Sequence, residues 1–164
     1  MKLRSVTLTA SMLLLSTLCA CSSVVDMIAQ QAQVQPDEAR IEFFAQRVES
    51  EKEYVQLMCR NHRLSDEFLL RDVEAGKHVL YVRARVINSN LDFQNVREAI
   101  VKFDVTLEGG KRYSLSQSRE GDQMKIWLQE SDTGLIASQI IDTTIEVPQM
   151  VGNLRVKQCR EGTV

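Results

Sequence analysis

Hydrophobic and polar residues alternate over long stretches in the second half of the chain. From residue 99 to residue 108 every second residue is hydrophobic, and the same period of two runs from residue 78 to residue 87. Successive side chains of a β-strand point to opposite faces, so each stretch predicts a strand with one face in a core. The residues expected in that core are Ala99, Val101, Phe103, Val105, Leu107, Leu80, Val82, Ala84 and Val86.

Shorter alternating stretches, separated by turn residues, predict further strands. Gly109-Gly110 predicts a hairpin turn, after which Tyr113 and Leu115 continue the core. Other inward positions are expected at Val55, Leu57 and Cys59, at Met124, Ile126 and Leu128, and in a hydrophobic strand between Leu135 and Ile141. About seven or eight short strands with turns between them predict an all-β fold, an antiparallel β-sandwich or barrel.

Residues 37–48 fit two kinds of secondary structure. Ile41 and Phe43 alternate with charged residues, which favours a strand. Ile41, Phe44, Ala45 and Val48 also fall at helical spacing, and Pro36-Asp37-Glu38 suits a helix start. Because the stretches that follow are all β, we favour the strand and keep the helix as the alternative.

The first 20 residues are typical of a secretory signal peptide. Lys2 and Arg4 precede a hydrophobic stretch from Val6 to Leu18, and small residues follow it. The hydrophobic stretch is shorter than the roughly 20 residues that a membrane-spanning helix needs. We therefore expect a signal peptide over residues 1–20, rather than a retained transmembrane anchor.

Leu18-Cys19-Ala20-Cys21 resembles the lipobox of bacterial lipoproteins, in which an aliphatic residue and two small residues precede a cysteine. The resemblance implies that Cys21 becomes the new N-terminus, with diacylglycerol on its sulfur and acyl chains such as palmitate. Cys19 departs from the commonest pattern, where Ala, Ser or Thr is usual, but cysteine is also small. Ser22 follows Cys21, whereas inner-membrane lipoproteins usually carry Asp there, so the resemblance favours the periplasmic face of the outer membrane.

The mature chain is expected to contain a lipidated tether over residues 21–36 and one β-sandwich domain over residues 37–164. The tether is rich in glutamine and small residues. If it is flexible, its mean reach is only about 20 Å, which would keep the domain close to the membrane. The mature length suits one domain with a modest core.

Two cysteines remain after Cys19 leaves with the signal peptide and Cys21 is lipidated. An even pair in an oxidising periplasm predicts a disulfide between Cys59 and Cys159. The alternative is a reactive or metal-binding thiol pair, for which His62 is the only histidine near either cysteine in the sequence. Neither cysteine belongs to a CxxC motif, so we favour the structural bond.

Charge and motifs argue against several classes of function. Removal of Lys2 and Arg4 with the signal peptide leaves a net charge of −4, which argues against a nucleic-acid partner. His62 and His78 are the only histidines, and no nucleophile elbow or metal-binding motif accompanies them. We interpret His62 as solvated and His78 as structural, and expect no catalytic residues, no metal and no cofactor.

Three further stretches resemble small envelope lipoproteins of unknown function. Residues 73–80 match a turn in which glycine, lysine and histidine precede a hydrophobic strand, and residues 103–113 match a strand that ends at Gly-Lys-x-Tyr. Residues 36–41 resemble the opening strand of the same group. The resemblance implies a transthyretin-like or immunoglobulin-like β-sandwich in the cell envelope, and it brings no catalytic residues.

Four residues are candidates for contact with a partner. Tyr81, Arg83 and Arg85 share one strand face and could bind an anionic polymer, although such residues more often pair with acids, here Glu98 and Asp104. Trp127 alternates with inward residues and is expected on an outer face, where it contacts a partner or is covered by other parts of the chain.

The sequence thus predicts a non-catalytic, lipid-anchored envelope protein that binds an envelope protein or supports an assembly. A glycan-binding or small-ligand-binding module that uses the Arg83 face is the alternative. An envelope hydrolase is a third possibility that lacks a nucleophile and a base in the sequence.

Overall fold

The structure is a computed structural model that describes residues 33–65, 71–88, 96–148 and 154–163. Internal contacts divide the chain into two compact units, Met1–Gln33 and Val34–Val164. The strands and the helix of the described residues all lie in the second unit. No helix in these described ranges combines the length and the hydrophobicity that are needed to cross a bilayer.

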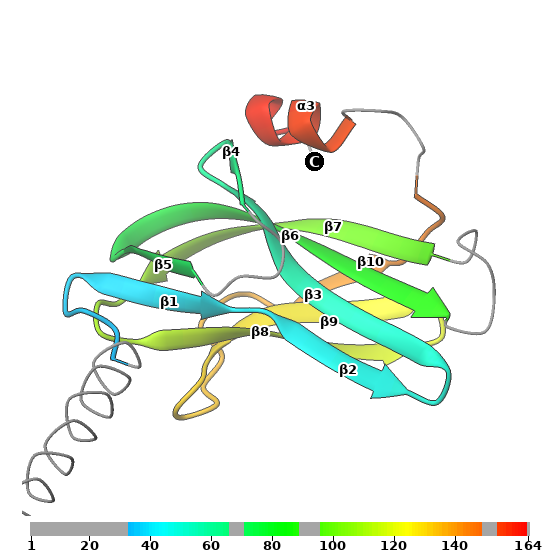
Figure 1. Cartoon of the computed structure of the whole chain (residues 1–164), viewed down its shortest axis with the longest axis horizontal. Coiled ribbons are helices and arrows are strands. Elements are labelled where there is room, and N and C mark those ends of the chain that lie inside the picture. Colours follow the sequence, from blue (N-terminus) through cyan, green and yellow to red (C-terminus); the bar gives the residue numbers. More distant parts are fainter. Residues whose placement is uncertain (1–32, 66–70, 89–95, 149–153, 164) are drawn as a thin grey trace, which may run out of the picture. The chain divides into compact units, whose positions relative to one another are not determined.

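The second unit is a sandwich of two β-sheets (Figure 1). The first sheet has the strand order β10-β9-β8-β1-β5, and the second has the order β2-β3-β6-β7 with β4 beside β3. Strand pairing is antiparallel except between β1 and β8, and the all-β sandwich prediction is confirmed. The strands are β1 Glu38–Glu42, β2 Phe44–Val48, β3 Glu51–Arg60, β4 Arg63–Leu64, β5 Arg71–Glu74, β6 Gly76–Asn88, β7 Val96–Leu107, β8 Arg112–Glu120, β9 Gln123–Glu130 and β10 Ile141–Thr144.

The segment with two interpretations is extended, so the strand is correct and the helix alternative is wrong. It forms β1 in the first sheet and β2 in the second, with Phe43 between them. Ala39 and Ile41 are buried, so the alternation that favoured a strand reflects the inward and outward faces of β1. The chain therefore passes from one sheet to the other at Phe43.

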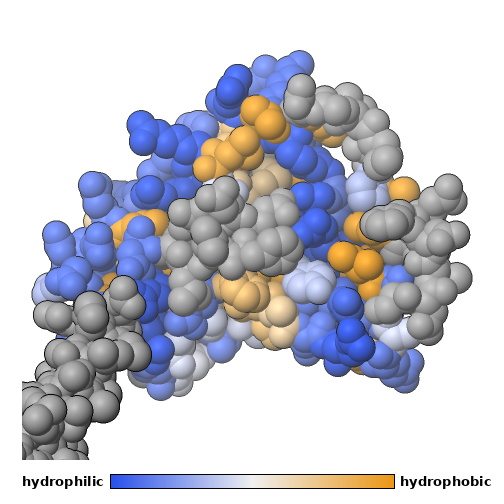
Figure 2. Space-filling view, viewed as in Figure 1, coloured by the Kyte–Doolittle hydropathy of each residue, from blue (hydrophilic) through white to orange (hydrophobic). Residues whose placement is uncertain are grey.

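The core lies between the sheets and contains the inward faces that the alternation predicts. Phe103, Leu80, Leu115, Met124 and Ile126 are among its largest buried side chains. β6 and β7 pair in continuous register from Gly76 opposite Leu107 to Ile87 opposite Val96, so their two hydrophobic faces coincide. Figure 2 shows that the face of the molecule seen in Figure 1 is mostly hydrophilic, with hydrophobic residues in small separate groups.

The prediction that Cys59 faces the same core as Val55 and Leu57 is wrong. The pairing of β3 with β6 shifts between Leu57 and Cys59, so the alternation of side chains is interrupted there. Val55 and Leu57 belong to the main core, whereas Cys59 belongs to a second buried cluster with Met58, Tyr81 and Cys159.

The expected hydrophobic strand between Leu135 and Ile141 is also largely wrong. A single isolated bridge, Ile136 with Gln129, precedes β10, which begins only at Ile141. Leu135, Ile136 and Ile140 are exposed, with 66%, 53% and 47% of their surface accessible. The segment follows the edge of β9, where no further strand of the described residues covers its side chains.

The C-terminal tail, for which the sequence shows little periodicity, contains the helix α3 (Leu154–Glu161). Cys159 is its only buried residue. The helix packs against β3 and β4 of the second sheet (Figure 1).

Candidate functional site

The two cysteines of the domain lie side by side beneath α3. The sulfurs of Cys59 on β3 and Cys159 on α3 are 2.5 Å apart, and both residues are fully buried. Burial and the neighbouring Cys159 thiol raise the pKa of the Cys59 thiol well above its usual value. The Cys59 thiol is therefore held in the protonated form in this packed state.

The predicted disulfide is not formed in the structure, where Cys59 and Cys159 are free thiols. A disulfide requires a sulfur–sulfur distance of about 2.05 Å, and the observed separation is longer than that. The prediction that the fold brings these two residues together agrees with their positions, while the covalent bond is absent.

Hydrogen bonds to α3 and to the residues after it surround the cysteine pair. His62 Nδ1 donates to the carbonyl oxygen of Cys159 at 3.2 Å, and the Tyr81 hydroxyl donates to the carbonyl oxygen of Gly162 at 3.3 Å. Val79 and Ile100 pack against the same cluster from the outer face of the second sheet. The C-terminal segment thus covers part of this sheet face.

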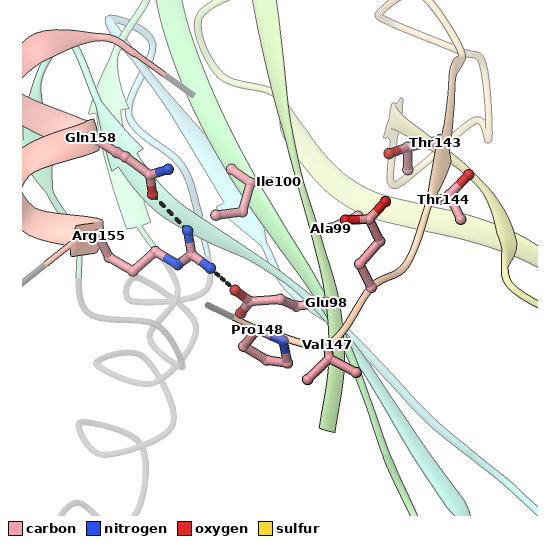
Figure 3. Close-up of a pocket in the computed structure, with 10 residues that line it drawn as sticks. Glu98, Ala99, Ile100, Thr143, Thr144, Val147, Pro148, Arg155 and Gln158 are labelled. Atoms are coloured by element: carbon pink, nitrogen blue, oxygen red, sulfur yellow. Dashed lines mark hydrogen bonds and ion pairs between the residues drawn. The ribbon is translucent and has the colours of Figure 1, made fainter. Parts of the chain in front are cut away.

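Glu98 on β7 connects α3 to the arginine-bearing face of β6. Its buried carboxylate accepts a hydrogen bond from Arg83 Nε at 2.7 Å and forms an ion pair with Arg155 of α3. Figure 3 shows Arg155 lying between Glu98 and Gln158, and its hydrogen bond to Gln158 is 2.6 Å long. Burial, together with the nearby Arg83, lowers the pKa of the Arg155 guanidinium.

A pocket of about 360 Å³ lies beside this cluster, between β7, α3 and the segment around β10. It presents carboxylates and hydroxyl groups together with the Arg155 guanidinium, all of which can bind hydroxyl-bearing ligands. Its lining residues are Glu98, Ala99, Ile100, Thr143, Thr144, Glu146, Val147, Pro148, Arg155 and Gln158 (Figure 3).

The candidate contact residues have different environments. Tyr81 is only 2% exposed because the C-terminal segment covers it, and Arg83 is paired with Glu98. Arg85 lies opposite Glu98 in the register of β6 and β7. Trp127 is half-buried on the outer face of β9, and its indole nitrogen donates to Gln129 Oε1 at 2.8 Å.

Both histidines make hydrogen bonds to the backbone. His78 is buried, and its Nε2 donates to the carbonyl oxygen of Glu74 at 2.7 Å, which holds the turn between β5 and β6. The sequence interpretation of His78 as structural agrees with this contact. His62 is exposed, as expected, and its ring also lies near Tyr81 and donates to the carbonyl oxygen of Cys159.

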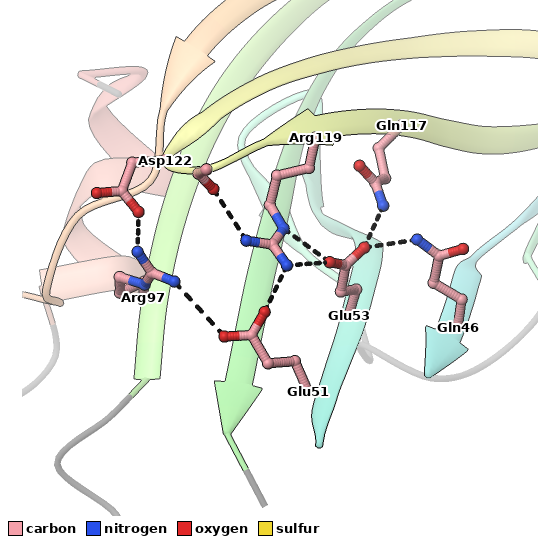
Figure 4. Close-up of polar contacts among 8 residues, drawn as sticks. Gln46, Glu51, Glu53, Arg97, Gln117, Arg119 and Asp122 are labelled. Carbon is pink, nitrogen blue, oxygen red and sulfur yellow. Dashed lines mark hydrogen bonds and ion pairs between the residues drawn. The ribbon is translucent and has the colours of Figure 1, made fainter. Parts of the chain in front are cut away.

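A buried polar network, missed in the sequence, lies where β2, β3 and β8 approach one another (Figure 4). Glu53 is 2% exposed and accepts hydrogen bonds from Arg119 Nε at 2.7 Å, from Gln46 Nε2 at 2.6 Å and from Gln117 Nε2. Arg119 also pairs with Glu51. Glu53 lies two residues before Val55 and four before Leu57, so the period-two alternation of the strand places its side chain on the same inward face.

Within the described ranges, no group of three or more His, Cys, Asp or Glu residues is arranged to hold a metal ion. Comparison of the chain with protein-family models, with curated proteins and with solved structures gives no match.

Proposed function

We propose that the chain is a non-catalytic lipoprotein, anchored through Cys21 to the periplasmic face of a bacterial outer membrane. Its β-sandwich would act there as a binding or structural accessory of the cell envelope. The observation that carries the proposal is the lipobox-like sequence at the end of a signal-like hydrophobic stretch, followed closely by a β-sandwich.

The environment of the histidines supports an accessory role over a hydrolase. A histidine that acts as general base needs a ring nitrogen within reach of a nucleophile. His78 instead donates to the Glu74 carbonyl oxygen and accepts from Asn61 at 3.4 Å, and His62 donates to the backbone of Cys159. These contacts favour a structural role for both imidazole rings.

The anchor is tested by mass spectrometry of the chain purified from bacterial membranes. The expected N-terminal peptide begins at Cys21 and carries diacylglycerol and acyl chains. Cys21→Ser should lack the lipid, whereas Cys19→Ser, the matched control two residues upstream, should retain it. A chain that begins at Met1 and fractionates with cytosolic proteins would overturn the proposal.

The accessory role is tested by cross-linking in intact cells followed by mass spectrometry. The expected result is reproducible cross-links between the β-sandwich and one envelope protein. If cross-links fail to concentrate on any envelope component, and a purified chain releases product from peptidoglycan or a lipid ester, the accessory role is wrong.

We also infer that Cys59 and Cys159 form a disulfide in the mature protein. The proximity of the two sulfurs and the oxidising character of the periplasm support this bond. In the reaction, the two thiols release two protons and pass two electrons to the disulfide of a thiol oxidoreductase, which becomes a dithiol. Oxidation should precede the docking of α3, because burial raises the pKa of the Cys59 thiol and the thiolate is the nucleophile.

A small-ligand or glycan-binding module is the second candidate, and the pocket beside Glu98 favours it. Soluble peptidoglycan fragments, titrated onto the isotope-labelled protein, should shift the NMR signals of Thr143 and Thr144 if this candidate is correct. Thr144→Val should weaken those shifts, while Thr106→Val on the exposed face of β7 should leave them unchanged. Absence of any shift at millimolar ligand would exclude this candidate for these sugars.

A further inference from the structure

The segment from Leu135 to Ile140 displays hydrophobic side chains on a backbone that is firmly held. Leu135, Ile136 and Ile140 are each about half exposed or more. The backbone around them is fixed by hydrogen bonds from Glu130 N to Leu135 O and from Ala137 N to Leu128 O, both 2.8 Å long. The side chain of Ser138 accepts from Leu128 N at 2.9 Å. Three exposed hydrophobic side chains within six residues of an ordered segment make it a candidate interaction surface.

This surface begins at the end of the sandwich where the chain enters its first strand. The carbonyl oxygen of Gln35, just before β1, accepts a hydrogen bond from Gly110 N at 3.1 Å. The next residues along the chain, Lys111 and Arg112, contact Glu130 and Ser131 at the start of the hydrophobic segment. Leu135 therefore lies at the same end of the first sheet as Gln35.

We propose that Leu135, Ile136 and Ile140 form a membrane-contact edge that inserts into the interface of the bilayer holding the lipid of Cys21. This inference rests on the proposed lipid anchor. Thirteen residues lie between Cys21 and Gln35, and the length of this segment limits how far the lipid can lie from the end of the domain at Gln35. The end of the domain nearest to the tether is consequently the end that meets the lipid.

The charges at this end favour a lipid interface bound by hydrophobic contact. Lys111 pairs with Glu108 and Glu130, and Arg112 pairs with Asp132. Together these paired side chains carry no net positive charge that would attract anionic headgroups. Trp127 lies on the same face of the first sheet as Ile136. Ile136 is opposite Gln129, which lies two residues after Trp127 on β9 and accepts the hydrogen bond of its indole. Tryptophan is the residue type most typical of membrane interfaces.

The test uses the full lipidated chain in phosphatidylcholine vesicles, with brominated acyl chains as the quencher. Trp127 is the only tryptophan, so Trp127→Phe provides a background without tryptophan fluorescence. Leu135→Trp in that background places the reporter on the membrane-contact edge. Val48→Trp is the matched control, because Val48 is 45% exposed but lies at the other end of the sandwich. Val48 pairs with Glu51, whose carboxylate contacts Arg119 near the end of β8 that is far from Arg112.

Bromolipid should quench the Leu135→Trp variant several-fold more strongly than the Val48→Trp variant, and high salt should not reduce the difference. Equal quenching of the two variants, or no quenching of either in vesicles that carry the chain, would overturn the membrane-contact edge and favour a protein partner for this segment. Flotation of the vesicles reports the anchor separately. A chain that fails to float would refute the proposed function, and the membrane-contact edge with it.

Discussion

Arg119 of β8 and Glu53 of β3 form an ion pair that joins the two sheets at one end of the sandwich. Glu53 is almost completely buried, and its carboxylate is held by this partner and by the amides of Gln46 and Gln117. A buried carboxylate is tolerated in a hydrophobic core only when it is paired and hydrogen-bonded. The pair therefore makes the approach of β3 and β8 specific.

Arg119→Ala should destabilise the domain by about 3–5 kcal/mol, because it leaves the Glu53 carboxylate buried without its charged partner. Urea unfolding followed by circular dichroism measures the change. Lys125→Ala is the matched control, since Lys125 forms an exposed pair with Asp142 and its removal should cost less than about 1 kcal/mol. Equal effects of the two substitutions would contradict the role of the buried pair.

Asp72 on β5 should give the domain a small pH dependence at acidic pH. Its hydrogen bond from Arg40, at 2.6 Å, lowers the pKa of the Asp72 carboxyl below its ordinary value of 3.8. The stability that this pair contributes is complete above the unfolded pKa and is lost as the pH falls through the lower, folded pKa.

The free energy of unfolding of the wild type should therefore fall more than that of Asp72→Asn between about pH 5 and about pH 2. The difference should be less than about 1 kcal/mol, because Asp72 is exposed to solvent. A larger acid sensitivity in Asp72→Asn than in the wild type would show that the sign is wrong.

Oxidation of Cys59 and Cys159 should stabilise the domain against urea. The bond would close a loop of about 100 residues, for which chain entropy gives up to about 4.7 kcal/mol. Comparison of urea midpoints with and without reductant measures the effect, with Cys159→Ser as the control that should not respond to reductant. An unchanged midpoint in the wild type would contradict a structural bond.

In the reduced, folded protein, Cys59 should react slowly with iodoacetamide. Burial raises the pKa of this thiol, so little of the reactive thiolate is present near neutral pH. Mass spectrometry of timed alkylation should show a large increase in the rate when urea is added. Rapid alkylation without denaturant would mean that α3 does not cover the cysteine in solution.

Arg155→Ala should loosen α3 in a Cys159→Ser background, where no disulfide can hold the helix. The substitution removes the pair with the buried Glu98 and leaves that carboxylate with Arg83. Hydrogen exchange of the amides of residues 154–163 should become faster. Lys157→Ala, on the exposed side of the same helix, should leave the exchange rates close to those of the background.

The core strands were predictable because their two faces meet different environments. Phe103 and Val105 face the core while Lys102 and Asp104 face water, and that contrast is visible in the sequence. The position of Cys59 was not predictable, because the register shift after Leu57 depends on the pairing with β6 and leaves no local signal.

The C-terminal half of the prediction failed for two physical reasons. The stretch from Leu135 to Ile141 is hydrophobic enough for a strand, yet most of its side chains have no second layer to pack against. Helix α3 has a single buried residue, Cys159, so its sequence lacks the hydrophobic stripe by which surface helices are recognised. Glu53 is a charged residue at a buried position. Its charge suggests the surface, although the alternation with Val55 and Leu57 places its side chain on the inward face.

The passage of the chain between sheets at Phe43 has a consequence for how the domain unfolds. Because β1 and β2 are consecutive, separation of either sheet from the core pulls on a strand of the other. Partial melting of one layer is thereby penalised, and heat denaturation of the sandwich should be a cooperative, two-state transition in which both sheets disappear together.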